Sequence, residues 1–370
     1  MFINNAESAS KRYNNIKLVI GIGKGIISFL MILFFVYLGY SEKLVEALSI
    51  YTSNNYLLFI LFTVVTGAAG SIIFAPISYY TGFYLEHKYD LSNQTFGAWI
   101  WEGVKGMLVG AAIGLPILLL FFWALNTFGS IWWLPFAVLM FIISVVLAQI
   151  VPIVIIPIFY KVTPLDDGEL KDKIITRAKE VGMKVENVFK FNMSKNTKKA
   201  NAAFTGLGKT KRIILGDTLL DNYSNDQIET VMAHELGHYK HKHIVKNIFI
   251  GTVFSFLTFF LIALLYKNSL NWFGFQNITQ IAALPLLTLW AMLIGLIQQP
   301  ISNIISRKFE YQADEYAVKS TGKREAFIST LDKLTEQNLG DREPHPFVEW
   351  FFYSHPSIKN RTDFINSIKI

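Results

Sequence analysis

Two histidines that flank a glutamate, in the segment His234-Glu235-Leu236-Gly237-His238, give the strongest chemical signal in the chain. In a helix, residues four positions apart lie on one face, so both imidazoles converge on one Zn²⁺ and Glu235 reaches a water beside it. Two surface histidines without a metal are the alternative, but only 7 of the 370 residues are His, which makes a chance pairing rare. The spacing is typical of metal-dependent peptidases.

A third ligand must come from elsewhere, because a catalytic zinc usually has three protein ligands and one open position. The chain has no Cys, so the ligands must be His or carboxylate residues, and disulfides and cysteine nucleophiles are excluded. His241 lies three residues after His238, but ligands from a single helix make a poor tetrahedral site, which favours a solvated or supporting role. Glu310 is the better candidate.

Glu310 and Asp314 are four residues apart, so a helix places both carboxylates on one face. One can bind zinc while the other accepts the free N–H of a ligating imidazole and so orients that ring. We assign Glu310 as the ligand and Asp314 as the supporting carboxylate, although spacing alone leaves the two roles interchangeable. Without the histidine motif, a solvated acidic pair would be the simpler interpretation.

The segment that carries the histidine motif is expected to be helical. Ser224-Asn225-Asp226-Gln227 is typical of an N-cap with a capping box, and Ile228, Val231 and Met232 form an apolar stripe after it. Gly237 lowers the helix propensity. It indicates close approach by another backbone or by substrate, or a packing role.

The composition predicts a polytopic membrane protein, because 52% of the residues are hydrophobic and the mean hydropathy is +0.37. Polar residues before the first apolar run, and no small-residue cleavage site after it, favour a retained span over a cleaved signal peptide. Six spans are predicted, at about 25–41, 56–85, 107–125 and 131–160, with two more within 245–305. Four prolines are expected to kink the third and fourth spans: Pro116, Pro135, Pro152 and Pro157.

The net charge of +7 is explained better by membrane topology than by nucleic acid, because the chain has no basic helix or aromatic-basic array. Six spans place the N-terminus, the 86–105 loop, the 161–244 region and the C-terminal tail on one side. The opposite side has only Lys43 and Lys267 as basic residues. The positive-inside rule makes the first side cytoplasmic, so the polar motifs share one compartment.

Residues 161–244 are expected to form a soluble protease region. Its pattern predicts an amphipathic helix at 167–181 and strands near 185–192, 201–206 and 212–216. Between the first two strands, the basic loop Lys195–Lys199 is interpreted as a solvated turn.

The C-terminal region, 306–370, carries the proposed third ligand and is expected to be helical at about 310–338 and turn-rich beyond. Together with membrane regions at 1–160 and 245–305, these elements predict a mainly α fold. It combines a helical membrane bundle or barrel with a small α+β zinc-metalloprotease domain on the cytoplasmic side.

Several segments in combination form a specific pattern that covers the chain from about residue 80 to its end. They are Glu86-His87-Lys88 with Asn93-Gln94-Thr95, Phe159 to Leu165, Asn201 to Phe204, Lys211 to Leu215 with Asp217 to Leu220, His234 to His238, Ser306 to Asp314, and Tyr353 to Pro356 with Arg361. This pattern resembles the integral-membrane zinc metalloproteases of the CAAX prenyl protease type I family.

The resemblance implies one zinc per chain, held by His234, His238 and Glu310, with Glu235 as the general base. Asn201 and Ala202 resemble the family's edge strand, which pairs with the substrate backbone. Two further residues match family positions near the catalytic centre: His355, which would stabilise the oxyanion, and Arg361.

Members of this family enclose a large, water-filled chamber within a helical barrel, with zinc at its cytoplasmic end. Eukaryotic members have seven spans, whereas six are predicted here, so the chamber is expected to be smaller or less closed. The implied partners are the lipid bilayer and peptide or membrane-protein substrates, prenylated or not, and no nucleic acid. The implied location is a bacterial cell membrane or the ER membrane.

Two other functions are considered. One is a general quality-control metalloprotease of membrane proteins. The other is a non-catalytic membrane chaperone that keeps zinc for structure. The intact Glu235 argues against the chaperone, because a purely structural zinc site needs no base.

Overall fold

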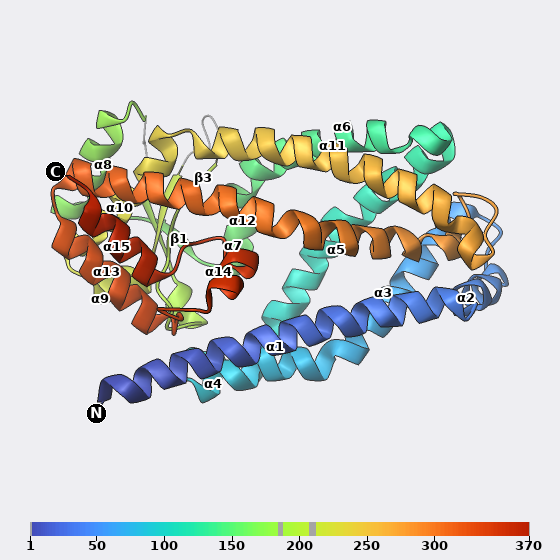
Figure 1. Cartoon of the computed structure of the whole chain (residues 1–370), viewed down its shortest axis with the longest axis horizontal. Coiled ribbons are helices and arrows are strands. Elements are labelled where there is room, and N and C mark those ends of the chain that lie inside the picture. Colours follow the sequence, from blue (N-terminus) through green and yellow to red (C-terminus); the bar gives the residue numbers. More distant parts are fainter. Residues whose placement is uncertain (1, 184–187, 207–211, 370) are drawn as a thin grey trace.

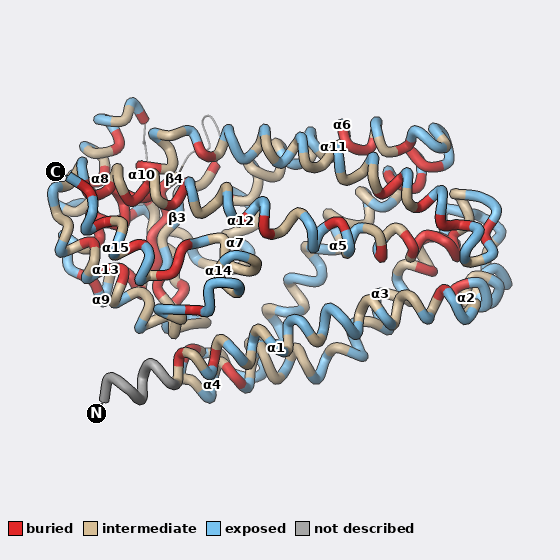
Figure 2. The backbone as a smooth tube through the Cα atoms, viewed as in Figure 1, coloured by how far each residue is buried: buried red, intermediate tan, exposed pale blue. Residues whose placement is uncertain are grey.

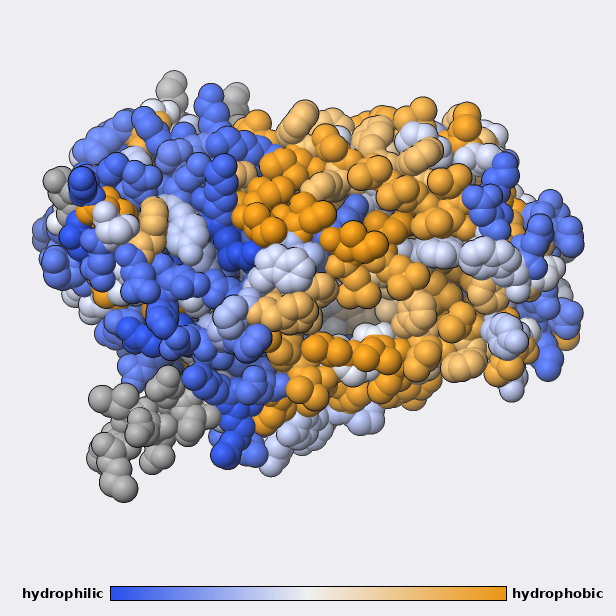
Figure 3. All heavy atoms as spheres, in the orientation of Figure 1, coloured by the Kyte–Doolittle hydropathy of each residue, from blue (hydrophilic) through white to orange (hydrophobic). Residues whose placement is uncertain are grey.

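The computed structural model describes residues 2–183, 188–206 and 212–369, and it is an elongated bundle of long helices with a small α+β unit at one end (Figure 1). In this described part, six helices are long and apolar enough to cross a membrane, which confirms the predicted number. Their side chains form a hydrophobic belt between two hydrophilic ends (Figure 3). Such a belt suits a bundle that spans a bilayer.

Short π- and 3-10 segments interrupt the N-terminal spans. The elements are α1 (Phe2–Tyr37), α2 (Tyr40–Ser49), α3 (Asn55–Tyr79), η1 (Tyr80–Tyr84), α4 (Leu85–Lys88), α5 (Phe96–Phe128), η2 (Gly129–Ile131), α6 (Trp133–Ile150), η3 (Val151–Ile155) and α7 (Ile156–Phe159). Pro152 lies in the π-helix η3, because proline lacks an N–H and disturbs the preceding turn. Pro135 lies in the first turn of α6, where its missing N–H costs no hydrogen bond.

The first helix begins much earlier than the apolar run at 25–41 predicts. α1 starts at Phe2, so its polar first half continues as a helix beyond the belt. Tyr13 packs in a buried cluster with Leu85 and Leu91, and Lys17 Nζ lies 2.7 Å from Glu86 Oε1. Contacts with distant residues hold this part of the helix, and hydropathy does not detect them.

The later half of the chain carries two membrane helices, α11 (His243–Ser269) and α12 (Pro285–Thr321), with η6 (Leu270–Phe273) and η7 (Ile281–Ala283) between them. The expectation that residues at about 310–338 are helical is confirmed, with one break. α12 ends at Thr321, and Gly322 has a φ of +67°, a left-handed conformation that commonly ends helices. The tail then forms α13 (Arg324–Gln337), α14 (Pro346–Phe352) and α15 (Ile358–Ser367).

A small sheet forms the centre of the soluble unit, and the described residues give it four strands in the order β1-β2-β4-β3. They are β1 (Val162–Pro164), β2 (Val188–Phe191), β3 (Ala202–Thr205) and β4 (Arg212–Gly216), followed by α9 (Asp217–Asn222). The central residues of the predicted strands are confirmed, although 185–187 lie outside the described residues. β1, whose three residues are too few for a pattern, was not predicted. The predicted amphipathic helix is α8 (Glu169–Glu180), which buries Ile174 and Ala178.

β3 lies at one edge of the sheet and pairs with β4 in antiparallel register, with Ala202 opposite Leu215. β2 runs parallel to β4, and β1 is antiparallel to β2 at the other edge. An edge strand presents unpaired backbone groups on its outer side, so β3 has the position that an added peptide strand requires.

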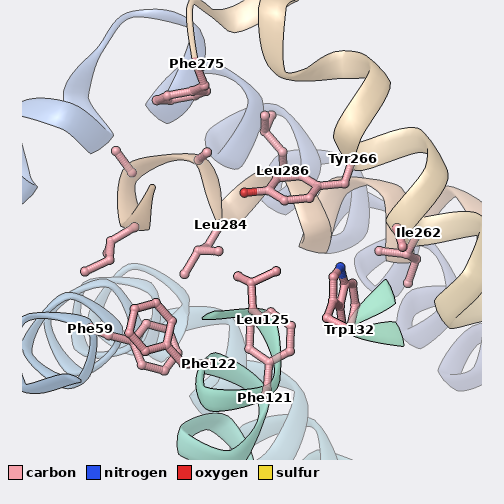
Figure 4. Close-up of a cluster of buried hydrophobic side chains, with 14 of the residues drawn as sticks. Phe59, Phe121, Phe122, Leu125, Trp132, Ile262, Tyr266, Phe275, Leu284 and Leu286 are labelled. Carbon is pink, nitrogen blue, oxygen red and sulfur yellow. The ribbon is translucent and has the colours of Figure 1, made fainter. Parts of the chain in front are cut away.

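Buried residues gather at the two ends of the molecule, in the soluble unit and at the end that contains α2 (Figure 2). At the α2 end, buried side chains from different helices form one apolar cluster, which includes Phe59, Phe122 and Tyr266 (Figure 4). Beside this cluster lies a cavity of about 920 Å³, lined by residues of α1, α2, α3, α5, α6, α11 and α12. Among the described residues its lining is mainly apolar and contains no charged side chain. This part of the bundle interior is therefore suited to hydrocarbon.

The interpretation of Lys195–Lys199 as a solvated turn is incomplete, because its lysines remain partly exposed but also form ion pairs with distant residues. Lys198 Nζ lies 2.5 Å from Asp90 Oδ1, and Lys199 Nζ lies 2.8 Å from Glu86 Oε2. Lys195 Nζ lies 3.1 Å from Glu102 Oε1 on α5. The loop thus joins the approach to β3 to the ends of membrane helices that precede it by about a hundred residues.

Glu86→Gln is expected to lower the unfolding temperature by a few degrees. Glu86 accepts hydrogen bonds from Tyr13, Lys17 and Lys199, and its side chain is 13% exposed. Because the two lysines remain partly solvated, we expect a loss of about 1–2 kcal/mol. Thermal unfolding in detergent measures this loss, with Glu46→Gln as the control, because Glu46 is exposed on α2. An equal effect of both substitutions would contradict this role of Glu86.

Candidate active site

The two motif histidines lie on α10 (Asn225–Lys240), and the capping box expected at its start is confirmed. The Ser224 hydroxyl accepts a hydrogen bond from the Gln227 backbone N–H, while the Gln227 side chain accepts one from the Ser224 N–H. α10 packs against α12, the helix that carries Glu310 and Asp314 (Figure 1). Two helices far apart in sequence thus present all the proposed ligands to one point.

His234, His238 and Glu310 form the one group among the described residues whose potential ligand atoms all lie within 4.8 Å of one another. The two Nε2 atoms are 3.2 Å apart, and each lies 3.4 Å from an oxygen of Glu310. Glu310 Oε2 is buried but makes no hydrogen bond to any described residue. Two imidazole nitrogens and one carboxylate suit Zn²⁺, and the unsatisfied oxygen indicates a cation there.

Asp314 lies on the far side of His234 from Glu310. Its Oδ1 is 2.8 Å from His234 Nδ1, and Arg361 donates to both Asp314 oxygens, at 2.5 and 2.9 Å. Burial lowers the pKa of His234, but the neighbouring carboxylates of Asp314 and Glu310 outweigh burial and raise the pKa to about 9. Asp314 faces Nδ1 of His234 and accepts its proton there, while Nε2 is the atom that faces Glu310.

Gly237 allows α10 to approach α12 closely, which is one of the roles its position in the motif indicates. A Cβ at this residue would lie 2.9 Å from the Ala313 Cα and 3.0 Å from the Ala313 carbonyl oxygen. Such distances are shorter than van der Waals contact, and backbone atoms cannot move aside as a flexible side chain can. Because Gly237 has no Cβ, α10 and α12 can lie this close together, and their separation sets the distance between the histidines on α10 and Glu310 on α12.

Gly237→Ala is expected to lower both the unfolding temperature and the zinc affinity, because it pushes the two ligand-bearing helices apart. Overpacking of this kind typically costs about 1–3 kcal/mol. Thermal unfolding and zinc titration of the purified variant measure the two effects. Gly251→Ala on α11, where a Cβ would meet nothing within 4 Å, is the matched control. Parent-like zinc affinity in Gly237→Ala would contradict this account.

The remaining predicted site residues lie at different distances from the cluster. His355 Nε2 is 3.5 Å from Glu310 Oε1, and its side chain is 65% exposed, so it faces the open side. Arg361 is buried behind His234, where it contacts Asp314 and does not face the open side. Asn201 directly precedes β3 and Ala202 begins it.

One residue beside the cluster was missed by sequence reasoning. His243, at the start of α11, is buried and lies 2.9 Å from His238 through their Nδ1 atoms. His241, which was weighed as a ligand, lies outside the ligand group and is half-buried. The signal available in the sequence was a third histidine shortly after the motif, but helical spacing favours His241 over His243.

Comparison with known proteins gives matches along nearly the whole chain. Residues 164–369 match the sequence model of peptidase family M48, and residues 3–161 match the CAAX prenyl protease N-terminal model, described as five membrane helices. CAAX prenyl protease 1 of Saccharomyces cerevisiae is 35% identical over 311 residues, which cover 79% of this chain and 68% of the yeast protein. The CAAX prenyl protease 1 homolog of Homo sapiens is 32% identical over 359 residues, covering 85% and 73%.

A bacterial relative and a solved structure extend the comparison. The uncharacterized metalloprotease YhfN of Bacillus subtilis is 32% identical over 335 residues, covering 89% of this chain and 78% of that protein. The crystal structure of S. mikatae Ste24p matches with a TM-score of 0.88 at 31% identity, covering 98% of this chain and 89% of that chain. The two chains thus share one fold over almost their full length.

The N-terminal region departs from the family description in one respect. Within residues 3–161, all of them described, four helices are candidates to cross the membrane, where the family model has five. α2 does not make up the difference, because its 10 residues are too few to span a bilayer. This region therefore has one membrane helix fewer than the family description.

Proposed function

The chain belongs to peptidase family M48 and is a membrane metalloprotease, and from this premise we propose that one zinc ion held by His234, His238 and Glu310 serves peptide hydrolysis. The observation that carries the proposal is the convergence of the three ligand atoms, with Glu235 between the two histidines on the same helix. A structural zinc site would need no carboxylate at that position.

Glu235 acts as the general base in the proposed reaction. It accepts a proton from the attacking water and later passes that proton to the leaving amine. A bound zinc would polarise the scissile carbonyl and lower the pKa of the attacking water. His355 faces the open side of Glu310 and donates to the oxyanion that develops on the carbonyl.

The supporting residues hold the ligands in place. Asp314 accepts the Nδ1 proton of His234, and Arg361 neutralises the buried Asp314 carboxylate with two hydrogen bonds. Asn201 and Ala202 present the backbone of the sheet edge to an extended substrate, which pairs with it whatever its side chains. Selectivity must then come from pockets or from the membrane bundle.

The active site is proposed to face the cytoplasm. The soluble unit, the N-terminus and the tail lie at one end of the hydrophobic belt (Figure 1, Figure 3). The opposite end carries only Lys43 and Lys267 as basic residues in the helices that reach it. The positive-inside rule therefore assigns the soluble end to the cytoplasm.

The relatives named CAAX prenyl protease 1 make a prenylated peptide the first substrate class to test. Along α12, the wall of the apolar cavity lies farther from Glu310 than a prenyl chain on a cysteine next to the scissile bond would reach. Ala291 is the nearest cavity residue on α12 and precedes Glu310 by 19 residues, which is about 28 Å of helix. A farnesyl chain is no longer than a lipid tail, which covers about half of a ~30 Å hydrocarbon core.

Cleavage of matched peptides tests the substrate class. Purified full-length protein is incubated with two peptides that end in the same Cys-aliphatic-aliphatic-X sequence, one prenylated on the cysteine and one not, and the products are identified by mass spectrometry. The proposal expects cleavage that a zinc chelator abolishes, with preference for the prenylated peptide. Equal cleavage of both peptides would favour general quality control of membrane proteins, and no cleavage of either peptide or of a membrane protein would refute the proposal.

A further inference from the structure

His243 lies between the two helices that carry the proposed ligands. It is 2% exposed, and its Nδ1 is 2.9 Å from the Nδ1 of His238 on α10. On its other side, Nε2 lies 2.9 Å from the Oε1 of Gln312 on α12. Its ring stacks on Phe309 with the centroids 4.2 Å apart and an angle of 10°. His243 thus contacts the proposed ligand His238 directly. It also contacts Phe309 and Gln312, which lie before and after the proposed ligand Glu310 in α12.

The backbone brings His243 into this place through an unusual turn. α10 ends at Lys240, and Lys242 has a φ of 56°, which a residue with a side chain rarely adopts. α11 then begins with His243 as its first residue, folded back against His238. A backbone conformation of this kind persists only where the surrounding contacts require it.

If Nε2 of His238 binds a metal, the two hydrogen bonds of His243, to His238 and to Gln312, require one particular placement of the ring protons. Nε2 of His238 faces Glu310 and His234, so its proton must be on Nδ1, the atom that faces His243. A neutral His243 then accepts that proton on its own Nδ1 and carries a proton on Nε2. This second proton is donated to the amide oxygen of Gln312, so Gln312 sets the tautomer of His243.

We propose that His243 is a positioning residue for the zinc ligand His238, an inference that rests on the zinc site proposed above. It accepts the Nδ1 proton and so holds Nε2 of His238 towards Glu310. His234 receives the same support from the Asp314 carboxylate, whereas His238 receives it from a neutral imidazole. Each proposed imidazole ligand therefore donates its Nδ1 proton to its own hydrogen-bond acceptor. The acceptor for His238 is the neutral ring of His243, which adds no negative charge beside the metal.

Two substitutions separate the hydrogen bond of His243 from its packing. His243→Phe keeps a ring that stacks on Phe309 but removes the acceptor, whereas His243→Asn returns an acceptor oxygen near the position of Nδ1. His241→Phe is the matched control, because it replaces a histidine of the same turn that lies outside the ligand group. Zinc affinity is measured on the purified full-length variants by competition with a chromophoric chelator, and the Co²⁺ absorption spectrum reports ligand geometry.

Loss of such a supporting partner typically costs about 10- to 100-fold in metal affinity, and we expect that loss in His243→Phe with an altered Co²⁺ spectrum. His243→Asn is expected to recover most of the affinity, and His241→Phe to bind zinc as the parent does. Parent-like affinity in His243→Phe would overturn the inference, as would equal losses in His243→Phe and His243→Asn.

A second variant decides the question if His243→Phe does not fold. Gln312→Leu leaves His243 in place but removes the acceptor that sets its tautomer, so we expect a smaller loss of zinc affinity in the same direction. Unchanged affinity in that variant would count against the inference. A parent protein that binds no zinc would instead refute the proposed function itself, so the two failures are distinguishable.

Discussion

The Glu235→Gln variant is expected to bind zinc as the parent does and to lose peptide hydrolysis by several orders of magnitude. The substitution keeps the shape of the side chain but removes the group that accepts the proton of the attacking water. General acid–base catalysis contributes about 10²- to 10⁴-fold on its own, and here the same carboxylate serves both proton transfers. Zinc content and initial cleavage rates of one peptide measure the two halves of the prediction.

Glu315→Gln is the matched control for Glu235→Gln. Glu315 lies on α12 next to Asp314, but its side chain is 46% exposed and pairs with Lys319 on the surface. Its substitution should leave both zinc content and turnover unchanged. Appreciable turnover in Glu235→Gln would assign the base to another residue, and His355 is then the first to test.

Glu310→Ala and Asp314→Asn are expected to differ in kind. Glu310 faces the Nε2 atoms of both histidines, so its loss removes one of the three ligands, and the variant should lose zinc under mild chelation and lose activity with it. Asp314 faces Nδ1 of His234, and an asparagine there still accepts a hydrogen bond. Asp314→Asn should retain zinc at saturating metal and turn over about 10- to 100-fold more slowly.

Titration of zinc into both variants, with cleavage of one peptide followed at each concentration, distinguishes the two roles. Arg361 is buried and loses its ionic partner in Asp314→Asn, so thermal unfolding is followed in parallel to separate lost stability from lost catalysis. If Asp314→Asn proves to be the variant that cannot hold zinc while Glu310→Ala binds it tightly, the two assignments are reversed.

Local sequence was sufficient wherever the signal lay within one helix or one apolar run. The spacing of His234 and His238 and the capping box at Ser224 are local patterns, and α10 follows them. The six spans were predictable because each needs only a long apolar segment. Their ends were less predictable, because α1 extends to Phe2 through contacts with residues such as Glu86.

Features that depend on tertiary contacts could not be predicted in the same way. The ion-pair partners of Lys198 and Lys199 precede them by about a hundred residues, so the sequence around the lysines does not indicate these pairs. His243 reaches His238 only because Lys242 adopts a left-handed conformation. The residue types in that turn do not predict this conformation. Helical spacing places Glu310 and Asp314 on one face, but only the packing of α10 on α12 decides which of them faces the two Nε2 atoms.

One measurement tests the central claim most directly, namely the dependence of peptide cleavage on bound zinc. Protein stripped of metal is titrated with Zn²⁺, and the cleavage rate of a prenylated peptide is recorded against the zinc bound per chain. The account predicts that the stripped protein is inactive and that the rate rises in proportion to zinc up to one equivalent and then stays constant. Cleavage that persists without zinc, or one tightly bound equivalent that restores no cleavage of any peptide, would contradict it.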